Sequence, residues 1–386
     1  MIVYLTEQGS ELVKVGRNLV IKKGEYSHTI FTHAVSQIVI IGNIKITHPA
    51  IVLIFKFGID AVFLAQNGKY IGRLAQEEPK NIFLRRKQFL LSEDKEFCLK
   101  TSKSIVIGKL TNLITVLMRI SRTKKSSIAK DKAGQIRMLL NDIGEAKSVD
   151  SVRGYEGRGS ALYFSALQYG LTKDWGFTKR VRRPPTDPVN SLLSLLYTFL
   201  MNKVYIAIRL ASLEPYVGTL HTLDYGRYSL VFDLMEEFRP IIADTLMLSI
   251  LNLEILNDSS FEREEVSPIE EAKEEGEISD LSKVVNDPIG LMRPYTLDDD
   301  FTPLPEHRVS EILEENINTT GKYPIKIVDT SIRKVIEAFE KKLSTKFYHS
   351  LAGKELTYLD AINFQARYYR RVIEGDVGEY VPLLLR

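Results

Sequence analysis

The sequence has a single cysteine, Cys98, and no long uninterrupted apolar run. One cysteine excludes an internal disulfide and a metal site built from several cysteines. The longest apolar runs, residues 192–201 and 245–253, are shorter than the roughly 20 residues that a helix needs to cross a bilayer. The first residues also lack a basic segment followed by an apolar one, so we expect no signal peptide and a cytoplasmic location.

Neither sign of charge dominates the chain as a whole, since 52 basic and 49 acidic residues leave a net charge of +3. The charge is unevenly distributed, however. Residues 262–280 hold nine acidic and two basic residues, a net charge of −7, which leaves +10 on the rest of the chain. Basic side chains gather at residues 85–87, 119–125 and 179–183. Solvated surface charge explains any one of these groups equally well, but several together favour nucleic acid over a small anion.

Residues 1–77 have the pattern of a small β-rich domain. Short runs rich in Val, Ile and Tyr alternate with turn residues, and Asn67-Gly68 between two such runs predicts a hairpin. The run HPAIVLIFKF, from His48, predicts a short buried helix between strands. The fold class is therefore expected to be α+β.

Residues 78–386 change to helical periodicity and predict a larger α-helical domain. Residues 257–285, rich in acidic residues and serine, are expected to form a solvated insertion or tether. A further helix is expected to be divided near Pro240. The helical stretches are predicted at residues 81–100, 102–121, 128–140, 190–213, 230–256, 309–316, 330–342 and 356–373.

Candidate metal ligands occur in the stretch HTLDYGRYSLVFDLMEEFRP, which begins at His221. Its apolar residues recur at helical spacing, so Asp233 and Glu236 project from one face, whereas Glu237 points elsewhere. A carboxylate pair with a histidine upstream supplies the oxygen and nitrogen donors that hold Mg²⁺ or Mn²⁺. A solvated, ion-paired surface helix explains the same pattern equally well.

A further carboxylate, Glu156, lies in the glycine-rich segment RGYEGRGSALYF. Small neighbours allow another backbone or a phosphate to approach closely. The segment lacks the Lys-Ser/Thr ending of a P-loop and follows no apparent strand, so a structural glycine turn is the favoured interpretation.

Four ordered segments together resemble the CRISPR-associated integrase family, the endonuclease and integrase subunits that insert new spacers into a CRISPR array. The resemblance extends over both predicted domains, and its specificity comes from the order of the segments. They are RGYEGRGSALYF, RRPPTDPVNSLLSLLY, GTLHTLDYGRYSLVFDLMEEFRP and FQARYYRRVIEGD.

This resemblance implies that Glu156, His221 and Glu236 are metal ligands for Mg²⁺ or Mn²⁺, and that Asp233 supports them. It further implies a homodimer formed through the β-rich domains, and a small CRISPR adaptation partner protein. The expected substrates are double-stranded DNA of the protospacer and of the CRISPR repeat. The bound metal would stabilise charge on a phosphodiester attacked by a DNA 3′-hydroxyl, and attack by water instead would give hydrolysis.

Other polar and aromatic residues near these motifs have two interpretations each. Arg158, Arg182, Arg183 and Arg227 are candidate DNA contacts, or partners of local acids. A general metal-dependent nuclease for branched DNA and a non-catalytic basic DNA-binding scaffold remain as alternative functions. Tyr163 and Tyr225 are expected to pack or to contact phosphate rather than to act as nucleophiles. Asn190 and Ser194 are expected to satisfy buried backbone groups or to support the site rather than to contact substrate, and Trp175 to fill the core rather than to stack on a base.

Overall fold

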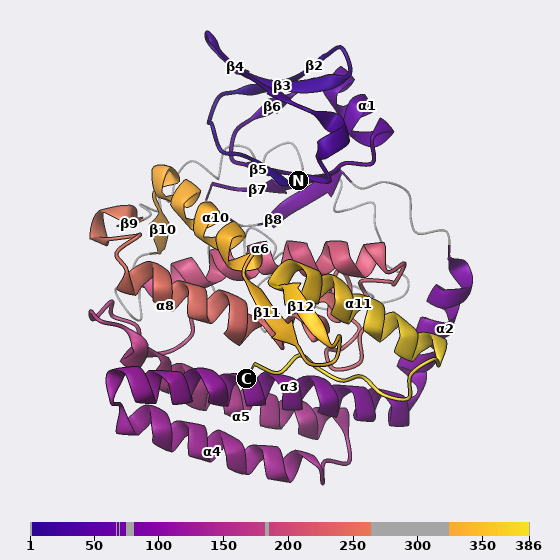
Figure 1. Cartoon of the computed structure of the whole chain (residues 1–386), viewed down its shortest axis with the longest axis vertical. Helices are drawn as coiled ribbons and strands as arrows, with labels where there is room; N and C mark the ends of the chain where they lie inside the picture. Colours follow the sequence, from indigo (N-terminus) through magenta and orange to yellow (C-terminus); the bar gives the residue numbers. More distant parts are fainter. Residues whose placement is uncertain are drawn as a thin grey trace, which may run out of the picture.

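The computed structural model begins with two four-stranded sheets that face each other (Figure 1). It describes residues 2–66, 68, 70–74, 81–181, 185–263 and 324–385. The strands of these two sheets are β1 (Ile2–Leu5), β2 (Glu11–Val15), β3 (Asn18–Lys23), β4 (Tyr26–Ile30), β5 (Gln37–Ile41), β6 (Lys45–Ile46), β7 (Asp60–Leu64) and β8 (Tyr70–Leu74).

The two sheets differ in strand direction. In the sheet ordered β1-β5-β7-β8, the first three strands are parallel and β8 pairs antiparallel to β7. In the sheet ordered β4-β3-β2-β6, the strands β2, β3 and β4 are antiparallel and β6 runs parallel to β2. The predicted hairpin is confirmed, since β7 and β8 are joined by a turn in which Gly68 has a φ of +82°. The predicted short helix is confirmed as α1 (His48–Lys56).

The central strand β5 connects the two cores of the molecule, because its side chains alternate between opposite faces. Ile38 and Ile40 belong to the core between the two sheets, which also contains the buried side of α1. Val39 and Ile41 belong to the large core shared with the helices. A sheet that is buried on both faces explains why all five residues of β5 are buried.

The helical part lies on the other side of this sheet (Figure 1). In the view of Figure 1, α3, α4 and α5 lie at the end opposite the two sheets, and α6 runs between them and the sheets. The helices are α2 (Ile82–Glu93), α3 (Lys95–Lys124), α4 (Ser127–Ile143), α5 (Val149–Leu167), α6 (Pro188–Leu210), α7 (Ser229–Met235), the π-helical segment η3 (Arg239–Asp244), α8 (Thr245–Asn252), α10 (Asp329–Leu343) and α11 (Tyr358–Glu374). The smaller elements are the 3₁₀ turns η1 (Thr32–Ala34), η2 (Gln168–Gly170) and η4 (Asp258–Ser260), and the strand pairs β9 (Phe261–Arg263) with β10 (Ile325–Ile327) and β11 (Lys346–His349) with β12 (Lys354–Thr357).

Most predicted helices are present, but some boundaries differ. The break in the first helical region falls at Asp94, whose side chain accepts hydrogen bonds from the amides of Glu96 and Phe97 and so caps α3. The expected division near Pro240 is found, since a π-helical segment separates α7 from α8. The predicted helix at residues 309–316 lies outside the described residues, as does the acidic stretch from residue 264 onward.

Two helices, α3 and α6, are long and apolar enough to span a membrane by length and composition alone. Buried core helices of folded proteins pass the same test, and the polar residues in α6 find partners inside the fold. Asn202 donates to Thr198 O at 2.9 Å, and Lys203 pairs with Glu340 at 2.7 Å. The most apolar window of α6 is 89% buried, as expected for the core helix of a folded protein.

Candidate metal centre

Glu156 lies in the middle of α5, so the glycine turn predicted for RGYEGRGSALYF is wrong. The glycines stand inside a helix because at least one of them is needed for packing. A Cβ atom on Gly159 would overlap the Leu110 side chain of α3. Close contact between α3 and α5 outweighs the low helix propensity of glycine, about 1 kcal/mol per residue relative to alanine. The same contact places Glu156 beside Lys109, which precedes Leu110 in α3.

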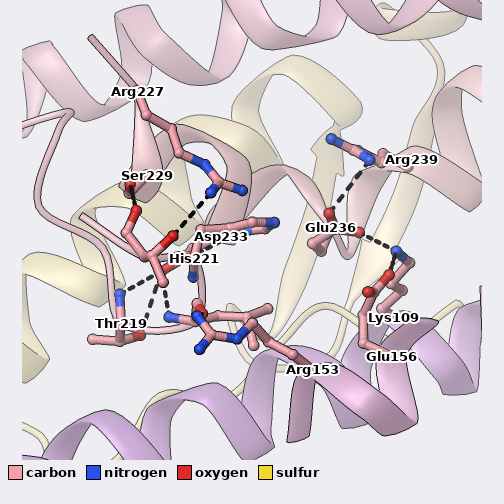
Figure 2. Close-up of polar contacts among 12 residues, drawn as sticks. Lys109, Arg153, Glu156, Thr219, His221, Arg227, Ser229, Asp233, Glu236 and Arg239 are labelled. Carbon is pink, nitrogen blue, oxygen red and sulfur yellow. Dashed lines mark hydrogen bonds and ion pairs between the residues drawn. The ribbon is translucent and has the colours of Figure 1, made fainter. Parts of the chain in front are cut away.

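Lys109 connects the two carboxylates that the sequence singled out (Figure 2). Its ammonium group forms an ion pair with Glu156 Oε1 and lies 2.5 Å from Glu236 Oε2. Ser160 Oγ also donates to Glu156 Oε1 at 2.8 Å, and Arg239 Nη1 lies 3.4 Å from Glu236 Oε1. Two carboxylates from α5 and the end of α7 therefore converge on one buried cation from α3.

The charges at this centre hold one another in the ionised state. Burial favours the neutral form of Glu236, but Arg239, Lys109 and His221 outweigh it and lower the pKa of this carboxyl to about 2. For Glu156, burial is likewise outweighed by Lys109, and the pKa is lowered. Burial opposes the charge on Lys109, but Glu156 and Glu236 raise its pKa. Both carboxylates and the ammonium are thus charged at neutral pH.

His221 lies in the loop before α7 and is oriented by Asp233 (Figure 2). Asp233 is fully buried and accepts hydrogen bonds from the amides of Thr219, Leu220 and His221 at 2.6–3.0 Å. Its Oδ1 atom also lies 2.7 Å from His221 Nδ1. Since a carboxylate only accepts, His221 Nδ1 carries a proton, and it is the neutral imidazole that would present Nε2 as a lone-pair donor.

The loop that carries His221 is tied down on both sides. Gly218 permits its path, because a Cβ there would lie 2.6 Å from Asp233 Oδ2 and 2.8 Å from the backbone of Ser229. From α5, Arg153 Nη1 donates to Leu220 O at 3.2 Å. The loop is therefore fixed to the same helix that carries Glu156.

The donor set fits a hard divalent cation, although within the described residues no three His, Cys, Asp or Glu side chains are already gathered around one point. Glu156 and Glu236 converge on a single positive charge. Glu236 Oε2 is buried and has no hydrogen-bond donor of good geometry among the described residues. A histidine with Nδ1 on a carboxylate and Nε2 open is the usual arrangement of a metal-binding imidazole.

The remaining sequence candidates lie apart from this centre. As expected, Glu237 points away, and its carboxylate accepts from Gln365, Tyr380 and Leu383. Tyr163 is fully buried and Trp175 packs edge-on against Phe261, so both have core roles. Tyr225 is 75% exposed and Cys98 is buried. Asn190 and Ser194 accept hydrogen bonds from Arg180.

The four predicted DNA-contacting arginines differ in accessibility. Arg158 is exposed on α5. Arg227 is buried and donates to Thr222 Oγ1 at 3.0 Å, within the loop of His221. Arg182 and Arg183 lie outside the described residues.

Sequence reasoning missed Lys109, although one signal was present. It is the single charged residue between Lys103 and Arg119, in the otherwise uncharged stretch SIVIGKLTNLITVLM. A lone lysine within a buried helix needs an acidic partner.

Comparisons with known proteins agree with this architecture. The family model for the CRISPR associated protein Cas1 matches residues 3–272. A CRISPR-associated endonuclease Cas1 from Chlorobaculum tepidum is 31% identical over 391 residues, which cover 99% of this chain and 98% of the relative. A second, from Thermus thermophilus, is 28% identical and covers 100% of this chain and 97% of the relative.

Solved structures show the same fold at lower sequence identity. A casposase bound to its integration product superposes with a TM-score of 0.75 at 20% identity, over 98% of this chain and 92% of that one. A CAS1 protein from Thermotoga maritima gives a TM-score of 0.73 at 19% identity, over 99% and 98%. The fold, β-rich and then helical, is thus of the kind found in a casposase and in a CAS1 protein. From the family match and the relatives together, the chain belongs to the Cas1 family of CRISPR-associated proteins.

Proposed function

We propose that this protein is a metal-dependent DNA endonuclease and integrase that inserts new spacers into a CRISPR array. The observation that carries the proposal is the convergence of Glu156 and Glu236 on one cation, next to a histidine whose tautomer Asp233 fixes. Relatives named CRISPR-associated endonuclease Cas1, and a casposase bound to an integration product, support both parts of the activity.

Glu156, His221 and Glu236 would bind Mg²⁺ or Mn²⁺, which prefer such oxygen and nitrogen donors. The bound ion would act as a Lewis acid on a phosphodiester attacked by a DNA 3′-hydroxyl or by water. Asp233 would fix the tautomer in which Nδ1 of His221 carries the proton and Nε2 faces the metal, and Arg239 holds Glu236 ionised. These residues thus present preformed negative charge and a fixed nitrogen donor, with little rearrangement at the time of reaction.

The proposed substrates are double-stranded protospacer DNA and the CRISPR repeat. A solved Cas6-RT-Cas1–Cas2 complex superposes on this chain with a TM-score of 0.75, which supports a small adaptation partner of the Cas2 kind. We further propose a homodimer formed through residues 1–77 and a cytoplasmic location. Because the chain outside residues 262–280 carries +10, binding to DNA should weaken steeply as salt is raised.

A strand-transfer assay tests the function. The purified protein and its partner are incubated with Mn²⁺, a repeat-containing duplex and a donor duplex that ends in either a 3′-hydroxyl or a 3′-deoxy nucleotide. We expect joined products only with the 3′-hydroxyl donor, and loss of products in the Glu156→Ala, His221→Ala and Glu236→Ala variants. Hydrolysis without joining would indicate a general nuclease instead. Full activity of all three variants would show that the site assignment is wrong.

A further inference from the structure

The proposed metal centre already contains a positive charge of its own. Lys109 is 6% exposed, and its ammonium group contacts both carboxylates that we assign to the metal. A buried carboxylate at Glu236 beside a half-buried one at Glu156, without a counter-ion, would destabilise the fold. The protein therefore needs a cation between Glu156 and Glu236 even when no divalent ion is bound.

An ammonium group and a divalent cation do not fit together at one position. Like charges a few ångströms apart repel strongly in a buried site. A divalent ion that binds Glu156 and Glu236 must therefore displace the Lys109 ammonium. A lysine suits such an exchange, because its charge sits at the end of a flexible four-carbon chain.

The structure also provides a place for the displaced group. A small cavity of about 30 Å³ adjoins the centre and is lined by Lys109, Ser160, Tyr197, Arg239 and Asp244, among others. Such a volume accommodates a group the size of a water molecule or an ammonium. Asp244 is 1% exposed and accepts a hydrogen bond from the Tyr197 hydroxyl at 2.7 Å. Its carboxylate is a second acidic partner within the same cavity.

We propose that Lys109 is an internal, displaceable counter-ion, which neutralises Glu156 and Glu236 in the metal-free protein and moves toward Asp244 when a divalent ion binds. This inference rests on the proposed metal site and concerns its regulation. Lys109 lowers metal affinity, because its ion pairs must be broken first. Asp244 raises metal affinity, because it receives the displaced charge. Lys109 is thus a positioning residue that sets how much metal the centre requires.

Titration calorimetry of the full-length chain with MnCl₂ alone tests this exchange. We choose about pH 8, because free carboxyl groups are ionised there. We expect Lys109→Gln to lower the Kd for Mn²⁺ about tenfold and Asp244→Asn to raise it about tenfold, each a change of about 1.4 kcal/mol. Adding Asp244→Asn to Lys109→Gln should not change the Kd further, because the double variant has no ammonium for Asp244 to receive. The matched control is Lys203→Gln, which removes another buried, ion-paired lysine and should leave the Kd unchanged.

The outcomes separate this inference from the metal site itself. If wild-type protein binds Mn²⁺, His221→Ala removes the binding and Lys109→Gln binds no more tightly than wild type, then the exchange is wrong and the metal site stands. If His221→Ala leaves binding intact, the metal site fails and the exchange fails with it. Should Lys109→Gln not fold, Asp244→Asn still decides, since an unchanged Kd in that variant overturns the proposal.

Discussion

Glu236 and Glu237 are adjacent in sequence and equally buried, at 2% and 1% exposure, yet their surroundings give them opposite properties. Glu236 faces Arg239 and Lys109, and these cations lower its pKa to about 2 in spite of burial. Glu237 faces Gln365, the Tyr380 hydroxyl and the Leu383 amide, all of them neutral. Burial therefore dominates and raises the pKa of Glu237 to about 8.

This difference shows that burial alone does not identify a functional carboxylate. Cations surround the carboxylate of Glu236, and neutral groups, mainly from the C-terminal part of the chain, surround that of Glu237. On the second side, Asn112 of α3 bonds to the backbones of Glu237, Leu383 and Leu385. One side of this helix end is therefore suited to chemistry and the other to holding the C-terminal segment in place.

The largest expected effect compares the two neighbours directly. Glu236→Gln should reduce Mn²⁺-dependent DNA cleavage and strand transfer by at least about 100-fold, because a metal ligand loses its charge. Glu237→Gln should leave both rates near wild type, because its partners are structural. Initial rates on nicked-duplex substrates measure the effect, with circular dichroism to verify folding. A folded Glu237→Gln variant as inactive as Glu236→Gln would remove the distinction between the two sides.

Asp233→Asn should give a smaller loss, about 10- to 100-fold, because the variant keeps the three metal ligands but loses the orientation of His221. The matched control is Asp224→Asn, an exposed carboxylate in the same loop whose side chain accepts only from the Tyr225 amide among the bonds described. Steady-state cleavage and Mn²⁺ affinity should both fall for Asp233→Asn and stay unchanged for the control. Equal behaviour of the two variants would assign Asp233 a purely local role.

The carboxylate pair on α7 was accessible to sequence reasoning because its own segment carries the signal. Asp233 and Glu236 stand one turn apart on an apolar helix, and the β7–β8 hairpin was marked by its Asn-Gly pair. In these cases the deciding interactions lie within about ten residues, where periodicity and turn chemistry operate.

Local sequence patterns did not predict the role of Lys109 or the helix that contains Glu156. Lys109 meets its partners because α3 packs against α5 and against the end of α7, which are about 50 and 130 residues away in sequence. The glycines around Glu156 favour a turn locally, and only the contact of Gly159 with Leu110 explains a helix. The β11–β12 hairpin likewise lies mostly between two predicted helices, where no strand was predicted. Long-range packing decided each of these features.

The Asn112→Ala variant tests whether the Glu237 side of this helix end holds the C-terminal segment in place. Three backbone groups lose their side-chain partner, so the free energy of unfolding should fall by about 2–4 kcal/mol. Cleavage per folded molecule should change little. Urea denaturation measures the loss, with the exposed Asn141→Ala as control. Loss of cleavage in a fully folded Asn112→Ala protein would mean that the C-terminal segment also positions Glu236.

The smallest expected effect concerns two lysines, Lys109 and Lys342, whose surroundings differ in the same way. Acidic partners raise the pKa of buried Lys109, whereas burial and the neighbouring Arg119 lower the pKa of Lys342 to about 8. Below that pH, Lys342 is protonated in both the folded and the unfolded protein, so the folded state bears the full penalty. Between pH 8 and the ordinary lysine value of about 10.5, only the folded protein loses the proton and the penalty disappears. Lys342→Met should therefore be more stable than wild type by about 1–2 kcal/mol at pH 7, after allowance for partial solvation.

This stability difference should shrink as the pH rises from 8 toward 10.5 in urea denaturation experiments. Lys341→Met, which alters an exposed lysine on the same helix, is the matched control and should show neither the gain nor its pH dependence. If Lys342→Met destabilises the protein at pH 7, the methylene contacts or the Tyr358 ring, 4.8 Å from the ammonium, contribute more than burial costs. A buried cation would then be tolerated here without an acidic partner, and the contrast between Lys109 and Lys342 would reflect packing rather than charge.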